Sequence, residues 1–465
     1  MLPVIAIIGA PNVGKSTLFN RLTGTRDALV ADEPGVTRDR QYGIAELAER
    51  RYLLVDTGGV TSAPESVQTQ ITEQAERAMD EADALLLLVD GRAGLSAADE
   101  ELVSRLRRRS ANIYLAVNKT EGFPPGAAVA DFHALGLRAP VAISAAHGHG
   151  VKSLIGDILD AIPVDEITSA EAEDDDTIRI AFVGKPNVGK STLVNRLLGE
   201  ERVVAHDMPG TTRDSIRVPL ERHGQRFTLI DTAGVRRRAR VDEAIERFSI
   251  IKSMQSIEAA NVVALIIDAR EGVTDQDATL LEQIERTGRA LVIAINKWDG
   301  LTPDDKAMVR RSLELKLNFV DYAAVHYISA LHGSGVGKMM DAGVAAWRAA
   351  MRKFSTPDVN ALLEDAIMRH PPPMVRGRRI KLRYAHQGGS NPPRIIVHGN
   401  QVNALPDAYK RYLARFFRTA FKLRGTPLWI ETRTSENPYE GRKNQLTPRQ
   451  IKNRKRMMRH VKRRR

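Results

Sequence analysis

Two nearly identical glycine-rich segments carry residue types that bind phosphate. GAPNVGKST spans residues 9–17 and GKPNVGKST spans residues 184–192, and both fit the pattern G-x-x-x-x-G-K-[ST]. Glycine lets such a loop curl so that successive N–H groups face phosphate oxygens, while the lysine reaches the β- and γ-phosphates and the hydroxyl ligates Mg²⁺. The sequence therefore predicts two nucleotide sites, whose phosphate loops consist of Gly9, Ala10, Pro11, Asn12, Val13, Gly14, Lys15 and Ser16, and of Gly184, Lys185, Pro186, Asn187, Val188, Gly189, Lys190 and Ser191.

Further motifs that could respond to the γ-phosphate follow each loop. PGVTRD at 34–39 and PGTTRD at 209–214 contain Thr37 and Thr212, whose hydroxyls we expect to complete the magnesium shell. DTGG at 56–59 and DTAG at 231–234 end in glycines whose N–H would lose its phosphate contact on hydrolysis, which makes a switch. The predicted magnesium ligands are Ser16, Thr37, Asp56, Ser191, Thr212 and Asp231, and the remaining residues expected at the phosphates are Thr57, Gly58, Gly59, Val60, Thr232, Ala233, Gly234 and Val235.

The position after each D-x-x-G motif is unusual for hydrolysis. Many switch proteins place a glutamine there to orient water, whereas this chain has Val60 and Val235. Hydrolysis should be slow unless another group supplies positive charge. Similarity to potassium-activated GTPases, in which such an asparagine ligates a cation that bridges the phosphates, implies that Asn12 and Asn187 could each do so here. The alternative is that these asparagines only shape their loops. The predicted catalytic residues are Asn12, Lys15, Thr37, Asn187, Lys190 and Thr212.

A third pair of motifs predicts guanine as the base. In NKWD at 296–299, the carboxylate of Asp299 can accept from both the N1–H and the 2-amino group of guanine, a pair of donors that adenine lacks. The first copy reads NKTE at 118–121, where the longer Glu121 should keep guanine binding, in a weaker form. With the later ISA motifs, the expected base-site residues are Asn118, Lys119, Thr120, Glu121, Ser144, Ala145, Asn296, Lys297, Trp298, Asp299, Ser329 and Ala330.

The spacing of these motifs reveals a duplicated domain. The phosphate loops, the PG-[VT]-TRD motifs and the D-T-[GA]-G motifs all repeat at an offset of 175 residues. Apolar runs precede the loops and helix-like stretches follow them, so each copy is predicted to be an α/β domain with a doubly wound, mostly parallel sheet. We expect a first G domain at 1–163, an acidic linker at 164–177 and a second G domain at 178–353.

The last quarter follows a different plan. A helix near 359–370, two strands joined by GGSNPP, a helix near 406–422 and a strand near 427–433 predict a small α+β domain at 354–440. Its aromatic stripe, Tyr409 to Phe421, has the spacing of a buried helix face. Residues 441–465 are expected to form a disordered basic tail, since 10 of the final 17 residues are Lys or Arg.

Charge and composition indicate which partners and which cellular compartment to expect for the chain. The net charge is +12, but residues 352–465 hold 28 Lys and Arg against 7 Asp and Glu, so the basic excess belongs to the last quarter and predicts a nucleic-acid partner. There is no cysteine, which excludes disulfides. No apolar run reaches the ~18–20 residues that span a bilayer. We therefore expect a cytoplasmic protein, a monomer, with no membrane partner.

In this order, the two PNVGKST loops, the two PG-[VT]-TRD loops and the basic C-terminal domain resemble the Der (EngA) family of tandem-G-domain GTPases over nearly the full length. The resemblance implies a GTP-hydrolysing switch that assists assembly of the large ribosomal subunit and its RNA. It also implies a KH-like C-terminal domain. A usual KH domain clamps RNA with a GxxG loop, and residues 352–465 contain none, so contacts through the basic surface are expected instead.

Several alternatives stay open on sequence alone. The first G domain could be a guanine-nucleotide sensor that does not hydrolyse GTP, with Glu121 as its only support. An ATP-driven RNA remodeller is a rival of another class, and NKWD argues against it. A membrane-associated signalling GTPase would need an anchor motif, which we do not find. Arg236, Arg237, Arg238 and Arg240 could carry the nucleotide state to RNA, or could simply be solvated.

Overall fold

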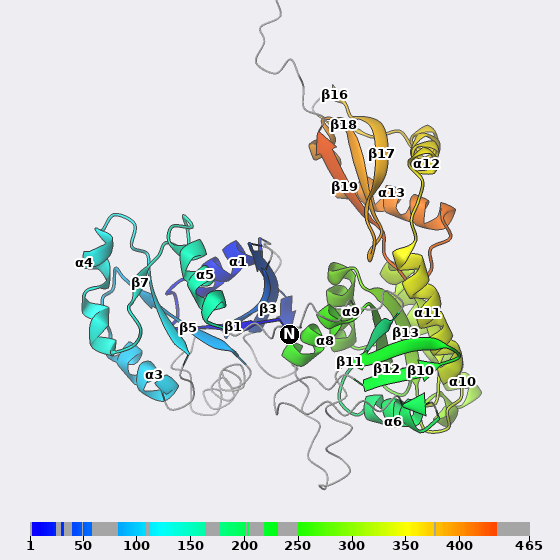
Figure 1. Cartoon of the computed structure of the whole chain (residues 1–465), viewed down its shortest axis with the longest axis horizontal. Coiled ribbons are helices and arrows are strands. Elements are labelled where there is room, and N and C mark those ends of the chain that lie inside the picture. The colour runs from blue at the N-terminus through cyan, green and yellow to red at the C-terminus, as the bar shows by residue number, and fades with distance from the viewer. Residues whose placement is uncertain are drawn as a thin grey trace, which may run out of the picture. The chain divides into compact units, whose positions relative to one another are not determined.

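The computed structural model describes residues 2–24, 29–31, 40–48, 50–57, 82–107, 112–162, 177–200, 202–203, 218–230, 250–375 and 378–434. The chain forms two compact units. Unit 1 comprises Met1–Arg352 with Lys422–Pro427, and unit 2 comprises Lys353–Phe421 with Leu428–Arg465 (Figure 1). The chain therefore passes between the units three times. None of the helices in the described ranges is long and apolar enough to cross a membrane.

Unit 1 contains two sheets of seven strands, one for each repeat. In the first sheet the strand order is β2-β3-β4-β1-β5-β6-β7, with β1 parallel to both β4 and β5 and only β2 and β3 running antiparallel to their neighbours. Its strands are β1 Val4–Ile8, β2 Leu29–Ala31, β3 Arg40–Leu47, β4 Arg50–Asp56, β5 Ala84–Asp90, β6 Ile113–Asn118 and β7 Val141–Ala142. Its helices are α1 Lys15–Thr23, α3 Ala97–Arg107, α4 Pro125–Val129, η1 Asp131–Leu135 and α5 Val151–Ala161.

The second sheet repeats this plan, in the order β14-β13-β12-β8-β11-β10-β9. Its strands are β8 Ile178–Val183, β9 Arg202–Val203, β10 Val218–Arg222, β11 Gln225–Ile230, β12 Val262–Asp268, β13 Ala290–Asn296 and β14 Ala324–Tyr327. The helices are α6 Lys190–Glu200, α8 Ile250–Ala259, α9 Asp275–Thr287, η2 Trp298–Gly300, α10 Pro303–Lys316, η3 Asn318–Val320 and α11 Val336–Met351. The predicted duplicated α/β fold is confirmed.

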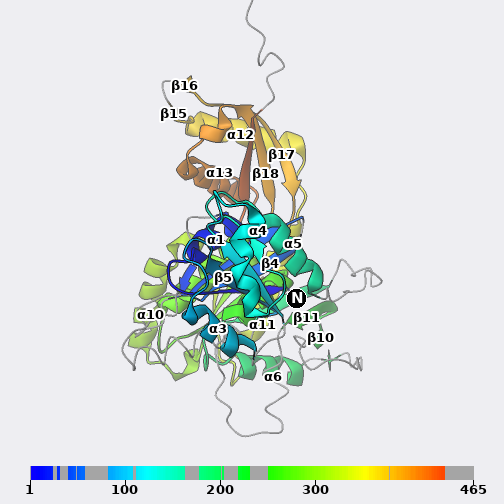
Figure 2. The ribbon, with the colours of Figure 1, turned by 90° about the vertical axis from the view of Figure 1, so that its left-hand side faces the viewer.

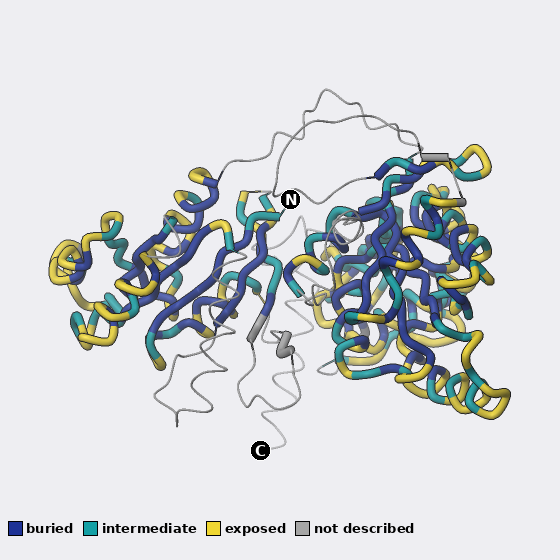
Figure 3. Tube along the Cα trace, turned by 90° about the horizontal axis from the view of Figure 1, so that it is seen from below, coloured by how far each residue is buried: buried dark blue, intermediate teal, exposed yellow. Residues whose placement is uncertain are grey.

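The central strands are apolar throughout because helices cover both faces of a parallel sheet. Every residue of β1 and of β13 is buried. In Figure 3 the dark blue of buried residues runs through the interior of the tube trace, and yellow marks mostly its outer loops. Each sheet contributes alternate side chains to two separate core clusters, one on each face. This rigid interior holds the carboxyl ends of the strands in place, and these are the ends from which the predicted motifs extend.

Unit 2 is the predicted α+β domain. Its three-stranded sheet has the order β17-β18-β19, antiparallel between the first two strands and parallel between the last two. Figure 2 shows both long helices on the same side of this sheet. The elements are α12 Thr356–Arg369, β15 Met374–Val375, β16 Arg378–Arg379, β17 Lys381–Gly389, β18 Arg394–Asn400, η4 Val402–Ala404, α13 Asp407–Ala420 and β19 Trp429–Thr434.

The aromatic stripe of α13 is largely the core face that its spacing predicts. Leu413 and Phe417 are fully buried, and Tyr409 and Phe421 are nearly so. Tyr412 lies partly buried, and its hydroxyl donates to the Ala366 carbonyl of α12 (2.9 Å), which joins the two helices.

Candidate nucleotide-binding sites

The first phosphate loop connects the buried end of β1 to the start of α1. Lys15 lies at the first turn of α1, and its Nζ donates to the carbonyls of Gly9 (2.9 Å) and Ala10 (2.7 Å). Gly14 has a φ of 103°, and a Cβ at this position would clash with the Nδ2 atom of Asn118. Only glycine fits there, so the loop follows the curled path that phosphate binding requires.

The second loop has the same construction. Lys190 donates to the carbonyls of Gly184 (2.9 Å) and Lys185 (2.6 Å). Gly189 has a φ of 98°, and a Cβ there would clash with Nδ2 of Asn296. Asn12 and Asn187 both adopt left-handed backbone conformations, with φ of 64° and 61°, and both side chains are exposed. The two repeats therefore present equivalent loops.

The beginning of α1 provides oxygen ligands of the kind that Mg²⁺ prefers. The Ser16 hydroxyl donates to Oδ2 of Asp56 at 2.9 Å, so the two predicted ligands are adjacent, and no group of three or more His, Asp or Glu side chains among the described residues offers a competing metal site. A hydroxyl and a carboxylate fit a magnesium ion that keeps waters and binds substrate phosphates. Lys15 is buried beside them, and this burial lowers the pKa of its amine, opposed by the negative charge of Asp56.

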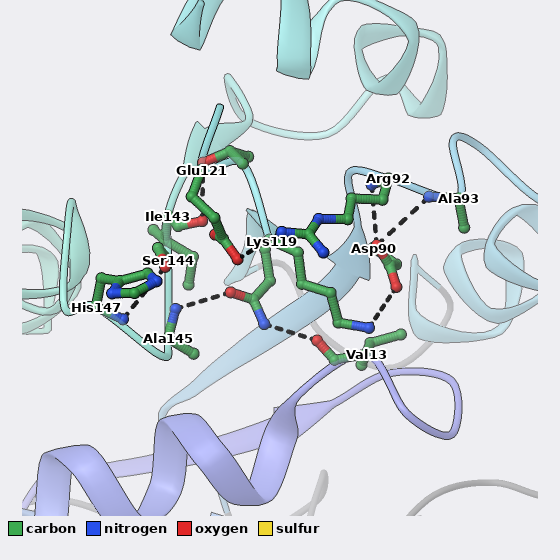
Figure 4. A network of polar contacts seen from close by, with 12 residues as sticks. Val13, Asp90, Arg92, Ala93, Lys119, Glu121, Ile143, Ser144, Ala145 and His147 are labelled. Atoms are coloured by element: carbon green, nitrogen blue, oxygen red, sulfur yellow. Dashed lines mark hydrogen bonds and ion pairs between the residues drawn. The ribbon is translucent and has the colours of Figure 1, made fainter. Parts of the chain in front are cut away.

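We call residues 118–121 and 296–299 the base loops. In the first of them, an asparagine joins the base loop, the phosphate loop and the ISA loop (Figure 4). The Nδ2 of Asn118 donates to the carbonyl of Val13 in the phosphate loop (2.7 Å), while its Oδ1 accepts from the N–H of Ala145 (2.8 Å). Both ends of this buried amide are thus engaged within the protein. The asparagine holds the phosphate loop and the ISA loop in register, a positioning role that the sequence did not predict.

The second repeat reproduces this bridge. Asn296 donates to Val188 (2.7 Å) and accepts from Ala330 (2.8 Å). The N–H of Ala330, which we expect to contact guanine O6, already donates to Asn296, so contact with the base would require a shared donor. The side chains of Ser144 and Ser329 each accept from a backbone N–H three residues later, which fixes the turns of the two ISA loops.

The lysine of each base loop is held by an acidic residue that ends a neighbouring strand. Lys119 pairs with Asp90 at 2.6 Å and also donates to the carbonyl of Asn12 (2.8 Å), while Lys297 pairs with Asp268 at 2.5 Å. Burial opposes the ionisation of Asp90, but the hydrogen bonds from Lys119 and the following loop hold its pKa below the usual value. These aspartates end β5 and β12, and the signal for them was the matched VDGR and IDAR strand ends.

The two carboxylates that are predicted to read the base have different neighbours. Glu121 pairs with Arg92 at 3.1 Å, whereas Asp299 lies 3.4 Å from His332. The pKa of Glu121 is held below its usual range by hydrogen bonds from the backbone N–H of Glu121 itself and from the Ser144 hydroxyl. The Ser329 hydroxyl does the same for the pKa of Asp299. Both carboxylates are therefore held in the ionised form, which is the form that accepts hydrogen bonds.

Of the remaining predicted site residues, some are described by the structure and others lie outside the described ranges. Trp298 packs against Tyr327 in a tilted arrangement, with ring centroids 4.1 Å apart and the guanidinium of Arg310 over both rings, so it supports the loop. The following predicted residues lie outside the described ranges: Thr37, Gly58, Gly59, Val60, Thr212, Asp231, Thr232, Ala233, Gly234, Val235 and the arginines 236–238 and 240. The same holds for residues 163–176 of the linker region and for the tail.

Comparison with known proteins matches the repeats and the C-terminal unit separately. A family model described as "50S ribosome-binding GTPase" matches residues 4–119 and 179–297. A model described as "KH-domain-like of EngA bacterial GTPase enzymes, C-terminal" matches residues 353–433.

Two relatives that match over their full length carry the same name. The "GTPase Der" of Thioalkalivibrio sulfidiphilus is 56% identical over 99% of this chain and 100% of its own length. That of Methylococcus capsulatus is 55% identical over 100% of both chains. Among solved structures, the G domain of the T. maritima FeoB iron transporter is 25% identical and covers 34% of this chain and 98% of its own, with a TM-score of 0.28.

Proposed function

The chain belongs to the Der family of GTPases and hydrolyses GTP, and we propose that it is a switch that assists maturation of the large ribosomal subunit. The observation that carries this proposal is the combination of two equivalent nucleotide sites with a strongly basic last quarter in one chain. Because RNA carries one negative charge per nucleotide, a basic unit moved by nucleotide state could bind and leave an assembling particle.

In each site the residues of this chain have distinct tasks. The phosphate-loop amides and Lys15 or Lys190 would bind the phosphates, and Ser16 with Asp56 would hold Mg²⁺, which neutralises developing charge when bound. Ser191 and Asp231 would do so in the second site. Asp299 and Glu121 would select guanine, with Thr37 and Thr212 closing over the γ-phosphate.

We further propose that potassium activates hydrolysis through Asn12 or Asn187. Both side chains are exposed within their phosphate loops, and the valines after the D-x-x-G motifs cannot orient water. A bound cation could supply the positive charge that an arginine provides elsewhere. Equal hydrolysis rates in sodium and in potassium would contradict this proposal.

The first G domain could instead sense guanine nucleotide without turnover, and the different partner of Glu121 is the observation in its favour. Full-length Lys15→Ala and Lys190→Ala variants distinguish the two: if both domains hydrolyse GTP, each variant retains part of the activity. Loss of all turnover in Lys190→Ala with little loss in Lys15→Ala would establish the sensor.

The ribosomal proposal is tested by sedimentation with purified large subunits. We expect a cytoplasmic monomer whose association differs among a GTP analogue, GDP and no nucleotide, and which weakens steeply between low and high salt. The control is the double variant Lys15→Ala/Lys190→Ala, which should lose the nucleotide dependence but keep basal binding. Failure to sediment in every nucleotide state at low salt would refute the proposal.

A further inference from the structure

One face of the sheet in unit 2 carries a cross-strand group of aromatic rings, which we call the ring face and define as Tyr384, His386 and His398. The rings of Tyr384 and His398 are stacked with centroids 4.4 Å apart and an interplanar angle of 3°. His386 stacks on His398 at 5.1 Å. Tyr384 pairs with His398 in the register of β17 and β18, so the group is fixed by the sheet itself.

The ring face is opposite the helices. Ala385, Ile395 and Val397 alternate with the rings along these strands and are fully buried, since they face α12 and α13. Tyr384, in contrast, is 45% exposed. An exposed aromatic ring at the end of a stacked group is suited to accept another flat ring rather than to complete a core.

Positive charge surrounds these rings. Lys381 and Arg383 extend from β17 and Arg433 from β19, and all three are exposed, with Arg433 directly opposite His398 in the register. The acidic residue of this face, Glu431, is already paired with Arg394 at 2.9 Å. The local charge therefore complements a phosphate backbone.

His398 also has an unused polar atom. Its Nε2 is buried and has no hydrogen-bond partner within the part of the chain that the structure describes. A buried polar atom without a partner is costly, so a small shift of the rings that opened this atom to the edge of a base or to a ribose hydroxyl would relieve the cost. This atom and the rings point to the same kind of ligand.

From this arrangement we propose that the ring face stacks unpaired RNA bases, with Lys381, Arg383 and Arg433 binding the adjacent phosphates. The inference rests on the proposed function, since it assumes an RNA partner, and it specifies the surface and the form of RNA. Aromatic stacking requires bases that are not already paired in a helix, so single-stranded RNA is favoured over duplex. It also explains how a KH-like unit without a GxxG loop can hold RNA.

The test measures binding of the full chain, with GTP analogue, to a fluorescent unpaired RNA of about 12 nucleotides and to a duplex of equal length. Tyr384→Ala and Tyr384→Leu should each weaken binding of the unpaired RNA about tenfold and change duplex binding little. Tyr384→Phe, which keeps the ring, should bind as the parent does. The matched control is Phe319→Ala in the second G domain, an aromatic side chain that is 44% exposed and should have no effect.

The charged residues provide a second, independent test of the proposal. Lys381→Ala and Arg433→Ala should each weaken unpaired RNA binding and reduce the slope of log affinity against log salt by about one phosphate contact. Unchanged binding in both Tyr384→Ala and Tyr384→Leu would overturn the proposal. So would equal losses for unpaired RNA and duplex, or loss of large-subunit association with RNA binding intact, which would indicate a protein contact.

These outcomes can be separated from failure of the proposed function. GTP hydrolysis should be unchanged in every ring-face variant, which also shows that the chain folds. If the parent sediments with large subunits but the ring-face variants bind unpaired RNA normally, only the ring-face proposal fails. A different result is that the parent never sediments with large subunits but binds unpaired RNA, and that Tyr384→Ala weakens this binding. The ribosomal proposal then fails and the stacking proposal stands.

Discussion

The two base loops of unit 1 have the same supporting contacts but differ in the carboxylate that we propose reads the base. In both, an asparagine ties the phosphate loop to the ISA loop through hydrogen bonds of 2.7 and 2.8 Å, and a lysine pairs with a strand-end aspartate. The reading carboxylate, however, is Glu121 next to Arg92 in the first loop and Asp299 near His332 in the second.

This difference shows which features of the site the duplicated fold constrains. The asparagine bridge lies in the buried interior, where its amide must satisfy two backbone groups at once, and it is the same in both copies. The carboxylates are partly exposed, with side-chain exposures of 27% for Glu121 and 39% for Asp299, so their length and partner can differ without disturbing the loops. The two sites should therefore share phosphate binding and differ in base affinity.

The largest expected effect comes from changing the reading carboxylate to an amide. Asp299→Asn offers a donor and an acceptor, which match xanthine rather than guanine, so GTP affinity of the second site should fall at least about a hundredfold while xanthosine triphosphate gains. Glu121→Gln should act in the same direction but less, about tenfold, because the longer side chain is less well placed. Each is measured by nucleotide competition in the full chain with the other site disabled by its lysine-to-alanine variant. Equal losses would remove the asymmetry between the sites.

The asparagine bridges should respond alike. Asn118→Ala and Asn296→Ala each leave a buried carbonyl and a buried N–H without partners, at a cost of about 1–3 kcal/mol for each group. Both variants should lower the melting temperature of their domain and weaken GTP binding about 10- to 100-fold. Calorimetry with and without nucleotide measures both quantities. If stability and GTP binding fell in one domain only, the two asparagine bridges would not have the same role.

The partners of the carboxylates should have small effects. Arg92→Ala removes the ion pair of Glu121 and should weaken GTP binding in the first site less than about fivefold, since exposed pairs contribute little. His332→Ala should change the second site even less, because the histidine pairs as an ion only when protonated. If Arg92→Ala instead strengthened binding, the pair would be competing with guanine for Glu121.

The smallest difference is expected in the pH dependence. Hydrogen bonds hold the pKa of both Glu121 and Asp299 below their usual ranges, so each carboxylate stays ionised as the pH falls. The contribution of each carboxylate to GTP binding is fully present above the ordinary pKa of the side chain. It is lost only as the pH drops through the lowered pKa in the folded protein. GTP affinity of each site should therefore be flat from about pH 8 to pH 5. Weakening above pH 5 in one site would show that its carboxylate is not held in this way.

Much of this could be predicted from the sequence because local patterns determine it. The strand–loop–helix motifs, the duplicated α/β plan and the helix–strand order of the last quarter all follow from apolar periodicity and turn residues over short windows. The role of Asn118 could not be found in this way, because its bond to Val13 spans 105 residues. Sequence reasoning placed it at the base, whereas the structure shows it joining two loops.

The ring face illustrates the same limit. Alternation along β17 puts Tyr384 and His386 on one side, which the sequence pattern could have shown. That His398 completes the stack depends on the register with β18, which includes two irregular positions and is set by tertiary packing.

The short segment Lys422–Pro427 belongs to unit 1 although the chain on both sides of it lies in unit 2. Gly425 accepts from the N–H of Leu291 (2.7 Å) and donates to the carbonyl of Tyr322 (2.7 Å), so it completes the backbone pairing at the start of β13. A stop codon placed after residue 352 would consequently not yield an intact tandem G-domain protein. It would remove the segment whose backbone pairs with Leu291 and Tyr322, so a single cut at this boundary does not separate the two compact units cleanly.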